Sequence, residues 1–277
     1  MRIAVTGASG FIGRHVIAEL QKSDVEIIAV VRNRDYVPTG RNVSVSYVDI
    51  YDESCEFPQC IGSPDAVVHL AWGGLPNYRS LHHFEEELPR QYRLLSEMVK
   101  NGLKSLVVAG TCFEYGMKSG PLREDLPAEP ANPYGYAKNA LRSQLEFLRK
   151  DVHFNFTWAR LFYLFGEGQA PNALYSQLKR AVENGECVFN MSGGEQLRDY
   201  LPAEKVAAYL ASFAVGSADA GLINIASGSP VSVRALVEGW IRENGWDIEL
   251  NLGYYPYPDH EPMAFWGDVT KLGYWST

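Results

Sequence analysis

The sequence has no long apolar run and no surplus of positive charge. No stretch approaches the roughly 20 apolar residues that cross a bilayer, so we expect no membrane segment. Met1 to Val5 leads straight into a glycine-rich turn rather than a signal peptide, and we expect a cytoplasmic protein. The formal net charge is −8, which argues against nucleic acid as a partner. An anionic substrate would have to meet a local cationic pocket.

Cysteine is also scarce, at four residues in 277. Cys55, Cys60, Cys112 and Cys187 show none of the spacings of a metal site, and we expect no bound metal. Free thiols in a reducing compartment are the simplest interpretation.

Short apolar runs alternate with helical patterns through the first part of the chain. Strands are expected over residues 2–6, 25–32, 43–49, 66–71, 105–109 and 154–161, and helices over 10–23, 82–101 and 133–150. This alternation predicts an α/β fold, a doubly wound parallel sheet of the Rossmann type with helices on both faces. Ligands then bind at the carboxyl ends of the strands.

The pattern changes after Gly166. Helices are expected over 171–185, 202–215 and 231–244, with a short strand over 222–226 and a tail of little regular pattern from Tyr254. We therefore predict a dinucleotide-binding domain over residues 1–166 and a smaller C-terminal α+β substrate lobe over 167–277. The boundary is soft, because segments of the lobe are expected to thread back toward the sheet.

A glycine-rich turn, Thr-Gly-Ala-Ser-Gly-Phe-Ile-Gly, follows the first predicted strand and opens a helix. In this context glycines predict a dinucleotide site. Gly7 permits the tight turn, Gly10 lets backbone amides approach the pyrophosphate, and Gly13 lets helix and strand pack closely. Phe11 and Ile12 lie between the last two glycines and belong to the same predicted cofactor contact. An ordinary βα turn is the alternative.

The tip of the second strand selects between NAD and NADP. An acid there binds the ribose 2′-hydroxyl, whereas an arginine accommodates a 2′-phosphate. Arg32 and Arg34 stand at this tip with no acid between them, which favours NADP(H) over NAD. The alternative is that both are solvated loop charges.

Three further positions are expected at the cofactor. Asp49, at the end of the third strand, is placed to accept a hydrogen bond from the adenine amino group. Leu70 and Ala71 close the fourth strand and would set their backbone against the cofactor. We expect His69, just before them, to be a packed, hydrogen-bonded residue rather than a catalyst.

Tyr134 and Lys138 stand four residues apart on a predicted helix and therefore share one face. An ammonium group near a phenol favours the phenolate, so we expect the pKa of Tyr134 to fall toward working pH. Thr111 directly follows the fifth strand, where its hydroxyl can bond a substrate oxygen or the Tyr134 phenol. This set predicts proton and hydride transfer at a carbinol or carbonyl. A surface i,i+4 pair is the alternative.

Together these motifs resemble the extended short-chain dehydrogenase/reductase family, which includes nucleotide-sugar epimerases, dehydratases and ketoreductases. The resemblance runs nearly end to end. It also draws on His-Leu-Ala at 69–71, Asn-Pro-Tyr-Gly-Tyr-Ala-Lys at 132–138 and Arg-Asp-Tyr at 198–200.

The resemblance implies a catalytic triad of Thr111, Tyr134 and Lys138, and a C-terminal lobe that binds a nucleotide sugar. Arg198 matches the family's cationic contact to the nucleotide diphosphate, which suits a guanidinium fork. A local ion pair between Arg198 and Asp199 is the alternative. The resemblance also implies a homodimer packed through the two helices that flank the fifth strand.

The chain departs from the family pattern at three positions. Glu87 and Tyr163 each stand where the family has asparagine. The asparagine replaced by Tyr163 contacts substrate phosphate in the family, so Tyr163 is a candidate substrate residue with an altered contact. Trp72 replaces an alanine beside the expected nicotinamide, where it either narrows the substrate pocket or packs into the core.

The residues after Thr111 are Cys112 and Phe113, whereas a 4,6-dehydratase of this family has Asp-Glu there, which argues against dehydration. The two arginines at the second strand then favour an NADPH-dependent reductase of a nucleotide-linked 4-keto-6-deoxyhexose, in deoxysugar biosynthesis for surface polysaccharide. A nucleotide-sugar 4-epimerase with tightly bound NAD is the alternative enzyme. A non-catalytic, cofactor-sensing protein is the alternative of another class.

Overall fold

The structure is a computed structural model that describes residues 1–32, 38–52, 60–257 and 261–275. Seven parallel strands form one sheet in the order β12-β7-β5-β4-β1-β2-β3. The strands are β1 (Arg2–Thr6), β2 (Glu26–Val31), β3 (Val43–Tyr47), β4 (Ala66–His69), β5 (Ser105–Thr111), β7 (Asn155–Leu161) and β12 (Gly221–Ile225).

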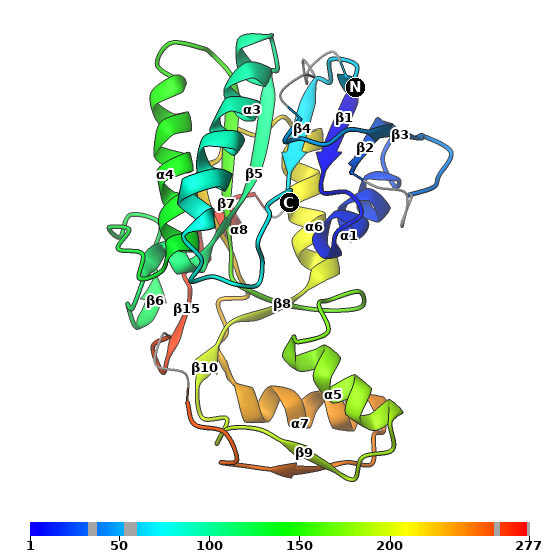
Figure 1. Cartoon of the computed structure of the whole chain (residues 1–277), viewed down its shortest axis with the longest axis vertical. Helices are drawn as coiled ribbons and strands as arrows, with labels where there is room; N and C mark the ends of the chain where they lie inside the picture. Colours follow the sequence, from blue (N-terminus) through cyan, green and yellow to red (C-terminus); the bar gives the residue numbers. More distant parts are fainter. Residues whose placement is uncertain (33–37, 53–59, 258–260, 276–277) are drawn as a thin grey trace.

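Helices cover both faces of the sheet. On one face lie α1 (Phe11–Leu20) and α6 (Ala203–Val215), and on the other α3 (Leu88–Lys100) and α4 (Pro133–Leu148) (Figure 1). Successive residues of a strand point to opposite faces. Ile3 and Val5 of β1 accordingly pack with the first pair of helices, and Ala4 packs with the second pair. This arrangement confirms the predicted doubly wound fold.

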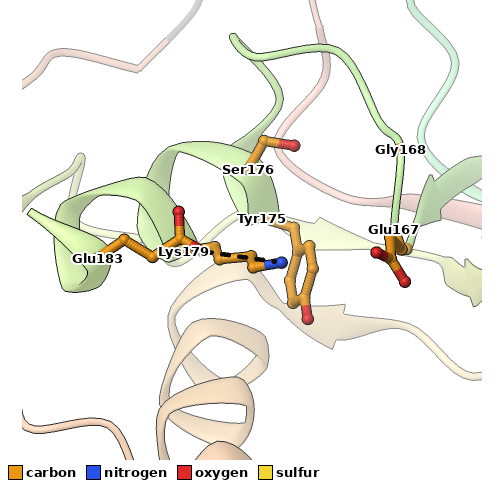
Figure 2. A pocket seen from close by; sticks show the side chains of 7 residues that line it. Glu167, Gly168, Tyr175, Ser176, Lys179 and Glu183 are labelled. Carbon is orange, nitrogen blue, oxygen red and sulfur yellow. Dashed lines mark ion pairs between the residues drawn. The ribbon is translucent and has the colours of Figure 1, made fainter.

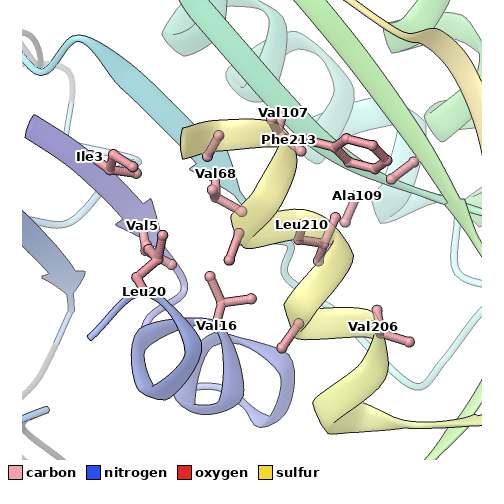
Figure 3. Close-up of a cluster of buried hydrophobic side chains, with 14 of the residues drawn as sticks. Ile3, Val5, Val16, Leu20, Val68, Val107, Ala109, Val206, Leu210 and Phe213 are labelled. Carbon is pink, nitrogen blue, oxygen red and sulfur yellow. The ribbon is translucent and has the colours of Figure 1, made fainter. Parts of the chain in front are cut away.

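The core between α1, α6 and the sheet is built from aliphatic side chains. Figure 3 shows Leu210 and Phe213 of α6 beside the strand residue Val107, with Val16 of α1 close by. All four are buried, Phe213 at 1% exposure. Their burial fixes α1 against β1, and so fixes the glycine turn that joins them.

The strand order reverses between β1 and β4. Chain connections leave β1 and β4 in opposite directions across the sheet, so a crevice opens at their carboxyl ends. Thr6 ends β1, His69 ends β4 and Thr111 ends β5, the next strand along. The predicted cofactor and catalytic positions therefore meet at one edge of the sheet.

A second, smaller core lies beyond the sheet, at the bottom of Figure 1. It joins α5 (Leu174–Glu183), α7 (Val233–Asn244) and the paired strands β9 (Val188–Asn190) and β14 (Glu249–Asn251) around Trp240. Three further strand pairs link the two parts: β8 (Tyr163–Phe165) with β11 (Tyr200–Pro202), β10 (Leu197–Arg198) with β13 (Val231–Ser232), and β6 (Gly120–Leu122) with β15 (Phe265–Gly267).

Several elements differ from the sequence predictions. The short strand expected in the lobe is β12, which pairs with β7 and is the seventh strand of the main sheet. The helix expected over 82–101 starts as a π-helix, η1 (His83–Glu87), before α3. The tail contains β15 and α8 (Thr270–Gly273), which its irregular sequence did not indicate. The division at residue 166 stays a prediction.

Cys60 is disulfide-bonded, so the prediction of four free thiols is wrong for it. Cys112 and Cys187 are free, and Cys55 lies outside the described residues. No helix in the described part of the chain is long and apolar enough to cross a membrane.

Two helical glycines give a test of the packing at the first βα turn. A Cβ added at Gly13 would lie 2.2 Å from the Gly7 carbonyl oxygen, whereas one at Gly239 in α7 meets nothing closer than Arg242 Nη2 at 3.9 Å. We expect Gly13→Ala to lower the free energy of unfolding by about 2 kcal/mol or more, because backbone must move. Gly239→Ala should raise it by about 0.5–1 kcal/mol through helix propensity.

Urea titration of both variants measures these changes. Equal effects of the two substitutions would contradict the close packing of α1 on the glycine turn.

Candidate active site

The glycine turn leaves room where side chains would stand. Gly7 has a φ of 67°, and a Cβ there would lie 3.0 Å from the Ala71 nitrogen. Gly10 begins α1 as its N-cap, so the first N–H groups of the helix point into this space. A helix N-terminus with free N–H groups binds an anion, so the cradle fits the pyrophosphate of a dinucleotide.

A buried hydrogen-bond chain ties β1 to β4 below this cradle. The Thr6 hydroxyl accepts from the Ala71 N–H (3.4 Å) and bonds His69 Nδ1 (2.9 Å). Gln91 donates its amide protons to the Ala71 carbonyl and to Glu87, so its oxygen must accept from His69 Nε2–H (2.7 Å). Burial lowers the pKa of His69 to about 3. His69 is therefore neutral and packed, as predicted.

Glu87 holds the loop after Ala71. Its buried carboxylate accepts hydrogen bonds from Gln91 (3.0 Å) and the Tyr51 hydroxyl (2.9 Å), and from the backbone of Gly73. Burial acts to raise the pKa of Glu87, but these hydrogen bonds outweigh it and lower the pKa. The carboxylate that replaces the family's asparagine is thus a fixed anchor for the loop beside the cradle.

Thr111 is positioned by a capping box. It is the N-cap of a short 3-10 helix, η2 (Cys112–Tyr115), and its hydroxyl accepts from the Phe113 N–H (3.3 Å). The Glu114 carboxylate accepts from the Thr111 N–H (2.9 Å) and from the Arg160 guanidinium (2.7 Å). Glu114 is fully buried and was missed by the sequence analysis, although Thr-x-x-Glu is a capping-box signal.

Tyr134 enters the site from the first turn of α4, which Asn132 caps by accepting from the Gly135 N–H (2.8 Å). Four rings surround the Tyr134 ring at centroid distances from 5.3 to 6.4 Å: Trp72, Tyr78, His83 and Phe113. Tyr78 and His83 were also missed, because no local spacing links them to Tyr134.

The pKa of Tyr134 moves opposite to the sequence prediction. Burial, and then the nearby Tyr78 and Glu114, raise the pKa of Tyr134 above its ordinary value, and the Thr111 hydrogen bond opposes this only in part. Lys138 is not among the groups that shift this pKa; its Nζ lies 5.9 Å from the Tyr134 ring centroid. Tyr134 is therefore a protonated phenol at neutral pH, suited to donate a proton.

Lys138 is buried behind Tyr134. Its Nζ donates to the Ala109 carbonyl (2.9 Å) and lies 4.0 Å from the centroid of the Trp72 ring. Burial lowers the pKa of Lys138 to about 7, with acidic neighbours, Glu114 first, opposing the shift. Lys138 can therefore gain or lose a proton near neutral pH.

Trp72 both packs against the core and faces the site. Its indole N–H donates to His83 Nδ1 (3.1 Å), and His83 Nε2 bonds the Asn77 carbonyl (2.8 Å). His83 must carry its proton on Nε2 to make both bonds, and burial lowers its pKa, which keeps it neutral. This chain fixes the indole against Lys138. A direct contact of Trp72 with substrate stays a prediction.

The opposite wall carries Tyr163 and Arg198. The Tyr163 ring lies 5.2 Å from the Tyr200 ring and 5.8 Å from the guanidinium carbon of Arg198. Cys112, next to Thr111, packs with Tyr163 in one apolar cluster. Cys112 thereby connects this wall to the predicted catalytic residues.

Arg198 pairs with Glu261 (2.9 Å) and not with Asp199. Asp199 is buried and accepts hydrogen bonds from the backbone N–H groups of Ser227 (2.6 Å), Gly228 (2.9 Å) and Gly267 (3.2 Å). The alternative of a local Arg198–Asp199 ion pair is therefore wrong. Asp199 instead fastens the loop after β12 to β15.

The remaining predicted cofactor residues lie around the cradle. Phe11 and Ile12 are half-buried in the first turn of α1, and Ile12 packs on the main core. Asp49 is exposed and accepts from the Tyr51 N–H (3.0 Å). Arg32 is exposed, and Arg34 lies outside the described residues. The roles of all these residues toward a cofactor stay predictions.

A separate pocket of about 230 Å³ lies between the loop at Gly166–Gly168 and α5 (Figure 2). Tyr175 and Lys179 line it, and Lys179 pairs with Glu183 (3.8 Å), both being largely exposed. None of the predicted catalytic or cofactor residues belongs to this pocket.

The doubly wound sheet and the glycine turn define a Rossmann-like fold, with the buried Thr111, Tyr134 and Lys138 gathered beside the turn. The model of the NAD dependent epimerase/dehydratase family matches residues 3–226. The chain belongs to this family, which confirms the resemblance found in the sequence.

The chain is similar to three proteins in particular. It is 30% identical over 270 residues to a dTDP-6-deoxy-L-talose 4-dehydrogenase (NAD(+)) of Aggregatibacter actinomycetemcomitans, covering 96% of this chain and 99% of the relative. It is 26% identical over 306 aligned positions to a UDP-glucose 4-epimerase of Bacillus subtilis (strain 168), covering 97% and 87%. MoeE5 in complex with UDP-glucuronic acid and NAD has a TM-score of 0.83 at 30% identity, covering 98% and 91%.

These findings correct the predicted cofactor. Both solved complexes of MoeE5 contain NAD, and the dehydrogenase is named for NAD(+). The prediction of NADP(H) is therefore wrong. Its physical weakness lies at the tip of β2, where Arg32 is exposed to solvent, and a solvated guanidinium does not by itself make a site for a 2′-phosphate.

The buried lysine predicts that the stability of the fold rises with pH above neutrality. Below a pKa of about 7 the fold must bury a charged Lys138, whereas the unfolded chain keeps it charged up to its ordinary value of 10.5. The unfolded state binds more protons between these values, so this group's contribution to stability rises with pH there. Lys138→Met, which buries no charge, should be more stable than wild type by on the order of 2–4 kcal/mol at pH 6.

The advantage of Lys138→Met should shrink by about 2 kcal/mol between pH 6 and pH 9. Urea unfolding of both proteins at the two pH values gives this difference, and other titrating groups cancel in it. A constant difference would mean that Lys138 keeps its ordinary pKa in the folded protein.

Proposed function

We propose that the protein is an NAD-dependent oxidoreductase that interconverts a hydroxyl and a ketone at C4 of a nucleotide-linked 6-deoxyhexose. The observation that carries the proposal is the buried set of Thr111, Tyr134 and Lys138 beside a glycine cradle. The alignment with the 4-dehydrogenase supports the substrate class, because it spans nearly all of both chains. A 4-ketoreductase and a 4-dehydrogenase catalyse the same reaction in opposite directions.

NADH, held at the cradle of Gly7 and Gly10, would supply hydride chemistry at C4 of the keto sugar. Tyr134 would donate its proton to the C4 oxygen as negative charge develops there. Its raised pKa keeps that proton in place at neutral pH. The Thr111 hydroxyl, held by the Glu114 capping box, stabilises the phenolate that remains. The surrounding rings exclude water from the transfer.

In the oxidative direction the same tyrosine must accept a proton. For this, Tyr134 must first be a phenolate. Lys138 has a pKa of about 7, so it can bind a proton and stabilise the phenolate with its positive charge. The Ala109 carbonyl and the Trp72 ring keep its Nζ in place during this change. Direction would follow the supply of keto sugar and NADH.

The second candidate is a nucleotide-sugar 4-epimerase, which the UDP-glucose 4-epimerase relative favours. That alignment needs 306 positions for a chain of 277 residues, so the epimerase carries insertions that this chain lacks. The alignment with the 4-dehydrogenase has no such excess, at 270 positions. The absence of these insertions therefore supports the dehydrogenase/reductase over the epimerase.

Two tyrosines of α4 provide a matched test of the mechanism. Tyr134 is buried in the site, whereas Tyr136 is 54% exposed two residues later. We expect Tyr134→Phe to lower kcat by roughly 10²–10⁴-fold, because the proton donor is lost. Tyr136→Phe should leave kcat within about twofold, because a surface phenol contributes little. Turnover is followed by the loss of NADH absorbance with dTDP- or UDP-linked 4-keto-6-deoxyhexose.

Near-normal turnover by Tyr134→Phe would sink the proposed mechanism. Sugar inverted at C4 without net loss of NADH, with NAD retained in the purified protein, would select the epimerase instead.

A further inference from the structure

Arg198 is almost saturated by hydrogen bonds within the protein. Its Nε and Nη2 both donate to Glu261 Oε2, at 3.3 and 2.9 Å. Its Nη1 donates to the carbonyls of Leu197 (2.9 Å) and Met263 (3.3 Å). A guanidinium has five N–H groups, so these four bonds leave one N–H for a ligand. A bidentate grip on a phosphate is therefore closed off while Glu261 stays in place.

The ion pair lies near the predicted catalytic residues. Glu261 and Cys112 interact electrostatically, and Cys112 directly follows Thr111 in the chain. Glu261 acts in the same way on Tyr78, whose ring lies 5.5 Å from the Tyr134 ring. The pair is therefore within electrostatic range of residues that adjoin Thr111 and Tyr134.

Glu261 is the more exposed partner of the pair. The Arg198 guanidinium is fixed between rings, with its carbon 4.7 Å from the Phe265 centroid and 5.8 Å from that of Tyr163. The Arg198 side chain is 3% exposed and that of Glu261 is 15% exposed. The Tyr163 hydroxyl is buried, makes no hydrogen bond of good geometry to the described residues, and has Glu261 beside it. The Tyr163 hydroxyl can therefore donate a hydrogen bond to the Glu261 carboxylate when that carboxylate leaves Arg198.

We propose that Glu261 is a specificity-determining residue that occupies the anion site of Arg198, and that a nucleoside diphosphate must displace its carboxylate to bind. The inference rests on the proposed function for the class of ligand. A diphosphate presents the same paired oxygens as a carboxylate and more negative charge, so it can replace Glu261 on the fork. An uncharged nucleoside cannot, because it would leave a buried guanidinium unpaired. The pair thus selects for the diphosphate of the substrate.

Glu261→Gln tests the competition, because it keeps the shape of the side chain and removes its charge. Isothermal titration with UDP and with dTDP should show binding about tenfold tighter than to the wild type, since a charged hydrogen-bonded partner no longer has to be displaced. Binding of uridine and thymidine should not change. Glu238→Gln, which removes an exposed carboxylate from a surface pair with Arg234, is the control for net charge and should bind as the wild type does.

Glu261→Asp covers the case in which Glu261→Gln does not fold. Its shorter side chain keeps the charge but reaches Arg198 less well, and several-fold tighter binding of UDP and dTDP is expected. Unchanged or weaker binding of both diphosphates by the folded variants would overturn the inference. A wild-type enzyme that still turns over the keto sugar would in that case leave the proposed function standing. Tighter diphosphate binding without any turnover would support the inference and refute the proposed function.

Discussion

The buried carboxylate of Glu114 is the charge on which the active site depends. It accepts hydrogen bonds from the Thr111 N–H of β5 and from the Trp158 indole N–H and the Arg160 guanidinium of the neighbouring strand β7. A Cβ at Gly110 would lie 2.7 Å from it, so glycine is required there. Because an uncompensated charge in this position would be very costly, each of these partners is fixed by the others. Thr111 is thereby held at the carboxyl end of β5 independently of any ligand.

Near Glu114 the site contains two titratable groups, Tyr134 and Lys138, and burial disfavours the charged form of each. Burial raises the pKa of Tyr134, which keeps the phenol neutral, and lowers the pKa of Lys138 to about 7, which lets the amine change its charge near neutral pH. A hydroxyl and an amine in such surroundings are shielded from bulk water. The aromatic wall that includes Trp72 and Tyr78 therefore has a chemical consequence as well as a packing one. The burial of a lysine that can carry charge also lowers the stability of the fold.

How much could be predicted from the sequence depended on how local each signal is. The glycine turn and the Tyr134/Lys138 spacing depend on a few consecutive residues, and the structure places them at the crevice between β1 and β4 as expected. The Arg198–Glu261 pair joins residues 63 positions apart, and no spacing rule connects them. The direction of the Tyr134 shift was mispredicted because the sequence shows an ammonium nearby but not how completely the phenol is buried. The cofactor was mispredicted because charge at Arg32 says nothing of its exposure.

Two buried basic side chains, Arg160 and Lys138, differ in whether a carboxylate pairs with them. Arg160 touches a carboxylate directly, and although burial alone would lower its pKa, Glu114 reverses this and raises it. Among the described residues no carboxylate lies within salt-bridge distance of Lys138, whose nearest partners are a carbonyl and the Trp72 ring. Its pKa therefore falls to about 7. Arg160 therefore stays charged near neutral pH, whereas Lys138, on the side of the proposed site that faces Tyr134, can change its charge.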